Sequence, residues 1–159
     1  MQILTDCPVL LGSSKVFDRE PEAVALRDLP DATRKLWQVF AGDAQPWRFP
    51  WMKDEIPHGL AIVVERSKQS QFDQLVQLAR EEDFIMPDIL ACVALAGENF
   101  HGQRERPWRA CLGNLHLSVY FRAGLPAANL NEEISILPTL ALMDALALEP
   151  HPQIGTGIR

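Results

Sequence analysis

The sequence predicts an α/β domain in which helices pack on a mixed β-sheet. Three observations support this class: a continuous apolar run at 60–64, a second one at 89–96, and a stretch at 114–122 in which apolar and polar residues alternate. Continuous apolar runs are typical of strands buried on both faces, whereas alternation is typical of a strand with one covered face. Amphipathic segments near 68–83 and 134–148 are expected to supply the helices.

The length, charge and apolar runs of the chain argue against a nucleic-acid-binding protein and against a membrane-spanning protein. The chain has 159 residues, which is typical of one domain. Fifteen Lys and Arg against twenty-one Asp and Glu give a formal net charge of −6, so no summed positive field attracts nucleic acid or an anionic membrane surface. The longest apolar run is far shorter than the roughly 20 residues of a membrane-spanning helix. We therefore expect no nucleic-acid partner and no membrane span.

The cysteines indicate a reducing compartment. The chain has three cysteines, Cys7, Cys92 and Cys111. Their odd number and the lack of C-x-x-C spacing argue against a disulfide framework and a zinc ribbon. The N-terminus has no basic region followed by an apolar core, so it does not resemble a signal peptide. We expect a cytoplasmic protein and, because the histidines show no ligand spacing, no metal site.

Residues 1–58 are expected to form a Pro/Trp-rich extension that packs on a domain spanning 59–159. Six of the twelve prolines fall in the extension, and each interrupts a strand ladder or a helix, which predicts irregular structure. Residues 31–41 favour a short helix that ends at Gly42. The aromatic stretch 46–51 is interpreted as a packing strip over the domain, with a partner-binding motif as the alternative.

The domain is expected to begin with a buried strand at 60–64 and an amphipathic helix. The apolar face of this helix is predicted from i, i+3, i+4, i+7 spacing and comprises Phe72, Leu75, Val76 and Ala79. Pro87 ends any continuation, and the second buried strand follows at 89–96.

The alternating strand 114–122 is expected to turn its apolar face to the core and its polar face to solvent. The predicted core face comprises Leu115, Leu117, Val119 and Phe121, and the predicted polar face comprises His116, Ser118, Tyr120 and Arg122. Asn131 and two following glutamates favour the start of a helix that runs to Leu148. Residues 153–159 are typical of the start of another strand, so the sheet is expected to be incomplete within this sequence.

The polar stretch between the second and third predicted strands has the composition of an anion site. Arg104, Arg106 and Arg109 supply guanidinium groups, Gly102 allows close backbone approach, and Trp108 offers an apolar wall. Arginine forks and backbone N–H groups are what a phosphate or carboxylate requires. The alternative is a solvated basic loop, partly neutralised by neighbouring glutamates, and the composition of the loop alone favours it.

Two motifs in this region resemble the catalytic domain of the biotin/lipoate protein ligases. The first is Gly102-Gln-Arg-Glu-Arg-Pro-Trp108, and the second is Gly113-Asn-Leu-His-Leu-Ser118. The family shows G-R-G-R-R-G-R-x-W followed by G-x-N-L-Y-x-S in the same order and at similar spacing. The resemblance extends over the predicted elements from about residue 59 to residue 159.

The resemblance implies a ligase that binds a carboxylic acid and ATP, with Mg, as an acyl-adenylate and passes the acyl group to a lysine of a carrier-protein domain. It implies biotin or lipoate as the acid. The residues that it places at the nucleotide are Gly102, Gln103, Arg104, Arg106 and Trp108, and those nearer the acid are Asn114 and His116.

Several positions depart from the family pattern. His101 and Gln103 stand where the family has arginine, and Arg159 falls where it has the lysine of Lys-Trp-Pro-Asn-Asp. Three alternatives to an active ligase therefore stay open: a fragment of a longer ligase, a chain that pairs with a second polypeptide or with itself, or a catalytically inactive binding or interaction subunit that retains the scaffold.

Overall fold

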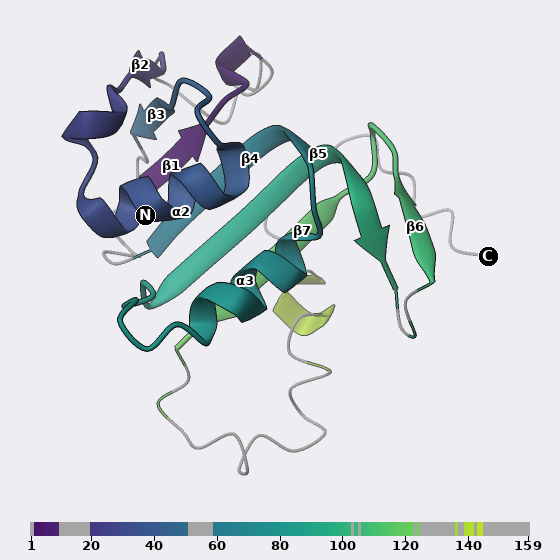
Figure 1. The fold of residues 1–159 in the computed structure, drawn as a ribbon. Coiled ribbons are helices and arrows are strands. Elements are labelled where there is room, and N and C mark those ends of the chain that lie inside the picture. Colours follow the sequence, from purple (N-terminus) through teal and green to yellow (C-terminus); the bar gives the residue numbers. More distant parts are fainter. Residues whose placement is uncertain are drawn as a thin grey trace. The chain divides into compact units, whose positions relative to one another are not determined.

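The structure of the chain is a computed structural model (Figure 1) that describes residues 2–9, 20–50, 59–102, 104, 106–122 and 124. In the segment that follows, it describes residues 136, 139–141, 143 and 144. The chain forms two compact units, 1–122 (unit 1) and 123–159 (unit 2).

Unit 1 contains a seven-stranded sheet with the order β2-β3-β1-β4-β5-β6, in which β7 also pairs with β5. The strands are β1 (Gln2–Thr5), β2 (Glu22–Ala23), β3 (Trp47–Pro50), β4 (Gly59–Ser67), β5 (Ile89–His101), β6 (Pro107–Ala110) and β7 (His116–Phe121). Strands β1, β4 and β5 run parallel, and the other pairings are antiparallel. The mixed sheet predicted from the sequence is therefore confirmed.

Strand β5 is 13 residues long and carries two successive partners on one edge. Its residues 89–94 pair with β7, and its residues 97–101 pair with β6. The other edge of β5 is occupied by β4 up to Gly97, so β6 and β7 lie one after the other on the edge away from β4. We call residues 97–110 the hairpin arm.

The arm begins at a bend in β5. The register shifts between Gly97 and Phe100, and Asn99 has a φ of 55°, a conformation that asparagine tolerates better than most residues. The ring of Phe100 folds back over Gly97, where a Cβ would collide with it. Glycine is required here because only a residue without a side chain leaves room for the ring.

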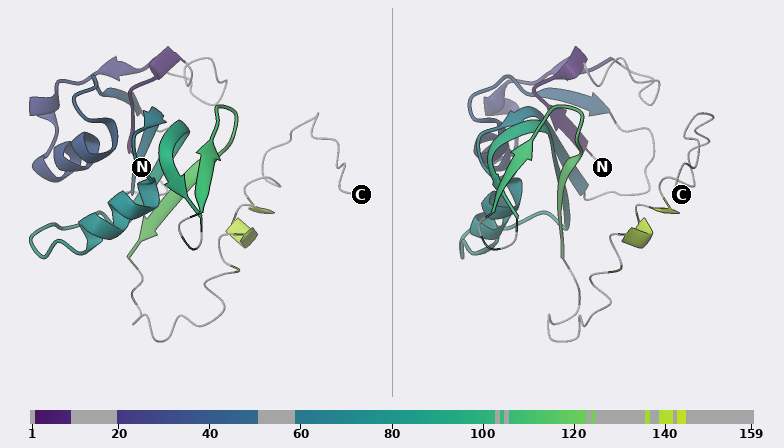
Figure 2. Two further views of the ribbon diagram at one scale, coloured as in Figure 1. Left: turned by 45° about the vertical axis from the view of Figure 1, so that its right-hand side comes forward. Right: turned by 90° about the vertical axis from the view of Figure 1, so that its right-hand side faces the viewer.

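Two α-helices cover one face of the sheet (Figure 2). The first is α2 (Asp31–Ala41), which confirms the predicted helix at 31–41. Pro30 precedes it with the φ that a helix start needs, and Gly42 ends it at a φ of 64°. A short 3-10 helix, η1 (Leu26–Asp28), lies before α2. The buried residues of α2 are Leu36, Trp37 and Phe40.

The second helix, α3 (Gln71–Ala79), is shorter than the predicted 68–83 and is rotated relative to the predicted orientation. Its buried residues are Gln71, Leu75 and Leu78, whereas Phe72, expected in the core, is 64% exposed. A polar residue takes a buried position because its amide bonds to the backbone. In the orientation that satisfies both ends, the Gln71 amide donates to the carbonyl of His116 (3.2 Å) and accepts from the N–H of Ala94 (3.3 Å).

Side chains of β5 alternate between two cores. Leu90, Cys92 and Ala94 belong to the helix-side cluster, while Ala91 and Val93 pack on a smaller cluster on the opposite face. The smaller cluster consists of Ile3, Cys7, Phe49, Ala61 and Val63. Both faces of the central strands are therefore covered, as the continuous apolar runs predicted.

The predicted orientation of β7 is wrong. His116 and Tyr120 lie opposite Ala94 and Leu90; directly opposed residues of an antiparallel pair share a face, so both lie on the helix side. His116 is only 9% exposed, and Tyr120 packs against the helix-side cluster. The predicted core face is instead half exposed: Leu117 48%, Val119 52% and Phe121 47%, with Leu115 at 65%.

The N-terminal segment is more regular than predicted. Residues 2–5 and 47–50 form strands of the main sheet, so the expected irregularity is wrong for these residues. Pro21 and Pro46 directly precede β2 and β3, and Pro50 is the last residue of β3, so these three prolines lie at strand ends. Within 46–51, Phe49 is fully buried, which favours the packing interpretation of the aromatic stretch; Trp51 lies outside the described residues. The division of the chain at residue 58 stays a prediction.

Most of the predicted C-terminal helix, and all of 153–159, lie outside the described residues. Those described between 136 and 144 are helical, and Ile136, Leu140 and Met143 are each more than half exposed. Within the described part of the chain, no helix has the length and apolar character needed to cross a membrane.

We predict that Gly97→Ala lowers the free energy of unfolding by about 1–3 kcal/mol, the range for overpacking a core. The added methyl group must displace the Phe100 ring, which packs on the helix-side cluster. Chemical denaturation of Gly97→Ala, Phe100→Leu and the double variant measures the coupling between the two positions. Strictly additive losses would show that the ring does not lie over Gly97.

Candidate functional site

The carboxyl ends of β4 and β5 and the start of α3 meet at one edge of the sheet. The connection from β4 to α3 is held by Ser67, whose hydroxyl donates to the carbonyl of Gln69 (2.7 Å). The side chain of Asn99 donates to the carbonyl of Lys68 (3.1 Å) and so ties the bent end of β5 to this connection. The carboxyl edge of parallel strands is where open α/β sheets bind ligands.

The tip of the hairpin arm is a tight turn that presents arginines to solvent. The N–H of Gly102 donates to the carbonyl of Arg106 (2.8 Å), and Arg104 adopts a φ of 61°. Both Arg104 and Arg106 are exposed. Trp108 is 61% exposed and lies beside Gly102, where a Cβ would be 3.8 Å from the indole Cε3. The Gly102 amide therefore closes the turn, and the guanidinium groups are the donors available to an anion.

Among the predicted site residues, His116 is buried against an aromatic ring. Its ring is tilted by 57° against that of Phe100, with the centroids 5.2 Å apart. Its Nε2 atom is buried and has no hydrogen-bond partner among the described residues. A buried polar atom without a partner costs about 1–3 kcal/mol, so its presence calls for an explanation.

The structure places the predicted site residues in two groups, one on the hairpin arm and one after β6, which consists of Asn114 and His116. Gly102, Arg104, Arg106 and Trp108 share the hairpin arm, while Gln103 lies outside the described residues. Asn114 is exposed in the turn after β6, and its N–H donates to the carbonyl of Cys111 (3.2 Å).

The hairpin arm and His116 meet through Phe100. It lies opposite Trp108 in the register of β5 and β6 and stacks on His116. Asn114 lies beyond the far end of four-residue β6, about 13 Å along the strand from the arginine turn. The arm and His116 are therefore brought together, and Asn114 is not brought to the turn.

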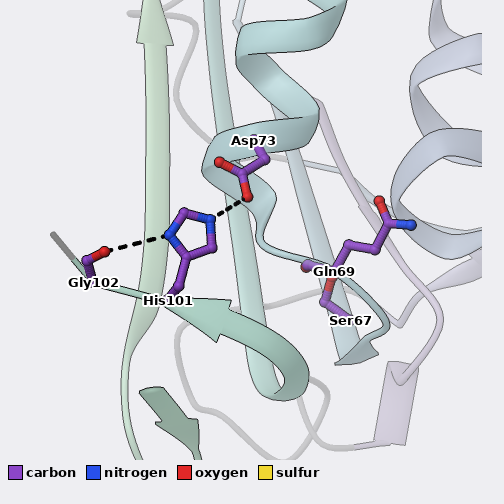
Figure 3. A network of polar contacts seen from close by, with 5 residues as sticks. All are labelled: Ser67, Gln69, Asp73, His101 and Gly102. Atoms are coloured by element: carbon purple, nitrogen blue, oxygen red, sulfur yellow. Dashed lines mark hydrogen bonds and ion pairs between the residues drawn. The ribbon is translucent and has the colours of Figure 1, made fainter. Parts of the chain in front are cut away.

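Sequence reasoning missed Gln71, Asp73 and the role of His101. The Nε2 atom of His101 lies 2.6 Å from Oδ2 of Asp73, in the first turn of α3, as Figure 3 shows. The sequence signal for Gln71 and Asp73 was weak, because a polar residue in the first turn of a helix usually faces water.

The end of β1 carries a second set of partly buried polar groups. The carboxylate of Asp6 accepts the N–H of Glu65 (2.7 Å), and burial raises the pKa of this carboxyl above its usual value. Burial also raises the pKa of the Cys7 thiol, which lies 3.2 Å from the hydroxyl of Thr5, and that of Cys92. These two thiols are buried, and Cys111 is exposed; all three are free.

No group of three or more His, Cys, Asp or Glu side chains in the described ranges could hold a metal ion. Comparisons of the chain with protein-family models, with curated proteins and with solved structures give no match.

We predict that His116→Phe raises the free energy of unfolding, because it removes an unpartnered buried nitrogen and keeps an aromatic ring against Phe100. The expected gain is about 1 kcal/mol, the lower end of the range for such an atom. Thermal and chemical denaturation measure it. A loss of stability would show that Nε2 has a partner in the folded chain.

We predict that Asp6→Asn stabilises the fold increasingly as pH rises. The folded-state pKa of Asp6 is raised above 3.8, so the native state binds more protons than the unfolded state, and ionisation above that pH lowers stability. The asparagine oxygen can still accept the N–H of Glu65. Denaturation from about pH 3 to pH 7, with exposed Asp43→Asn as the control, should show the variant's advantage growing with pH; a constant difference would contradict the burial effect.

Proposed function

We propose that the chain is similar in function to the biotin/lipoate protein ligases: it binds a carboxylic acid and ATP as an acyl-adenylate, for transfer to a lysine of a carrier-protein domain. The observation that carries the proposal is the buried Nε2 of His116, which has no partner among the described residues and lies under the arm that bears the arginine turn. This nitrogen is closed to solvent in the structure, so an acid would supply the missing partner only after a local rearrangement admits it. The two motifs that resemble the family thus contribute to one region.

The exposed arginines fit the anionic half of such a ligand. Arg104 and Arg106 can each form charge-assisted hydrogen bonds to phosphoryl oxygens. Preorganised donors of this kind stabilise the charge that gathers when a carboxylate attacks a phosphate. ATP, when bound, would supply the adenylyl group that activates the acid, and pyrophosphate would be the leaving group. The described residues offer no carboxylate cluster, so the proposal assigns no protein ligand to Mg.

Trp108 gives the arginine turn an apolar side. Its indole lies beside Gly102 and is 61% exposed, so it is free to contact a base or an acyl chain. Covering either would exclude water from a reactive anhydride. An apolar wall next to two cations suits a ligand that is both anionic and partly apolar, as an acyl-adenylate is.

A catalytically inactive binding or interaction subunit is the second candidate. Two observations favour it: the Gly102 amide is used inside the turn, and His101 bonds to Asp73 where the family has arginine. The half-exposed apolar side chains of β7 also suit a second polypeptide or self-association.

We predict that Arg104→Ala and Arg106→Ala each weaken binding of a non-hydrolysable biotinyl- or lipoyl-adenylate analogue by roughly 1.5–3 kcal/mol, the range for a hydrogen bond to a charged group. Both side chains are exposed, so melting temperatures should change little. Calorimetric titration measures the affinities, and Arg109→Ala, on the same arm but within β6, is the matched control. Unchanged affinity in both variants would reject the turn as the anion site.

Pyrophosphate exchange with ATP and biotin or lipoate separates the two candidates. Exchange by the purified chain supports the ligase. Binding of the analogue without exchange supports the inactive subunit, and absence of binding rejects both uses of this region.

A further inference from the structure

His101 joins two parts of the chain that are 28 residues apart in sequence. It is the last residue of β5 and lies directly before the arginine turn, whereas its partner Asp73 belongs to the first turn of α3. The Nε2 atom lies 2.6 Å from Oδ2 of Asp73, and Nδ1 lies 3.4 Å from the carbonyl oxygen of Gly102 (Figure 3). The ring thus contacts both the body of unit 1 and the start of the turn.

Both of these partners are hydrogen-bond acceptors. A carboxylate and a backbone carbonyl have no proton to give, so each nitrogen satisfies its contact only by donating. A neutral imidazole has one N–H and an imidazolium has two. Both of these contacts are hydrogen bonds at the same time only when the ring is protonated, and the Asp73 contact is then a charge-assisted hydrogen bond.

The other contacts between the arm and the rest of unit 1 lie nearer the bend. Among the described residues they include the Asn99 bond to the carbonyl of Lys68 and the packing of Phe100 on His116. The nearby charged pair of Arg66 and Glu98, 3.7 Å apart, joins β4 to β5 at the same level. Among the described residues, the His101–Asp73 bond joins the arm to α3 directly before the turn that holds Arg104 and Arg106.

We propose that His101 and Asp73 are positioning residues that fix the arginine turn against α3 through a charge-assisted hydrogen bond, so that the turn is held for anion binding when His101 is protonated. This inference rests on the proposed function. It gives His101 a role different from that of the arginine it replaces: it orients the arginines without touching the ligand. Among the described residues, the charged group in contact with it is Asp73 from α3, and the charged groups near it in the chain are Glu98, Arg104 and Arg106 on the arm.

The test measures arm mobility by residue-resolved amide hydrogen exchange in the whole chain. His101→Phe and Asp73→Ala should each raise the exchange rate of the Gly102 and β6 amides about fivefold, the effect of losing about 1 kcal/mol from a partly exposed pair. His101→Gln keeps a neutral N–H for Asp73 but carries no charge, so at a pH below the imidazole titration its exchange rate should lie between those of the wild type and His101→Phe. Asp83→Ala, beyond the other end of α3, is the matched control.

A pH series adds a readout that a purely structural role would not move. After correction for intrinsic exchange, wild-type arm protection should fall as pH rises through the imidazole titration, near 6.5 for an unperturbed ring, while His101→Gln should show no such step. The proposal is overturned if the arm amides exchange as fast in His101→Gln as in His101→Phe, or if they are equally protected in all variants.

Titration of the same variants with a non-hydrolysable biotinyl-adenylate analogue links the arm to the site. We expect His101→Phe to bind about fivefold more weakly and His101→Gln to bind with an affinity between those of the wild type and His101→Phe. If amide exchange in the arm becomes faster while the affinity for the analogue is unchanged, only the positioning role of His101 is overturned. A wild-type chain that does not bind the analogue rejects the proposed function, whatever the exchange rates show.

Discussion

Strand β5 sets the constraint on which the rest of unit 1 depends. Its first half is buried between β4 and β7 and must remain straight, because residues 89–94 pair on both edges. After Gly97, its second half no longer pairs with β4 and pairs only with β6. The change of partner occurs where Phe100 turns back over Gly97. One strand therefore serves as the centre of the sheet and as the root of the arm that carries the arginine turn (Figure 1).

The same constraint explains why polar side chains gather beneath the arm. The register of β7 on β5 turns His116 towards the helices, and the Gln71 amide bonds to the backbone of Ala94 and His116 where the ladder begins. A buried glutamine and a buried imidazole at the edge of an apolar core reduce stability unless their atoms are satisfied. Gln71 is satisfied by the backbone, whereas the Nε2 of His116 has no partner among the described residues. This difference makes His116 the residue on which the proposed ligand site depends.

The elements with strong periodicity were predictable from the sequence, and their orientations were less so. Strands β4 and β5 follow from the apolar runs, and the end of helix α2 follows from Gly42. The face of β7 could not be predicted from its alternation, because the register with β5 decides which residues turn inward and a shift of one residue reverses them. The arginine turn was recognisable from its residue types, but the bond of His101 to Asp73 joins distant parts of the chain and left no local pattern.

The orientation of Phe100 tests the account most directly, since the bend, the arm and the environment of His116 all depend on it. Nuclear Overhauser effects in solution can locate its ring protons. The account predicts cross-peaks from the Phe100 ring to the Hα protons of Gly97 and to the imidazole protons of His116, whose ring centroid lies 5.2 Å from that of Phe100. Cross-peaks to Leu117 on the opposite face of the sheet, with none to Gly97 or His116, would contradict it.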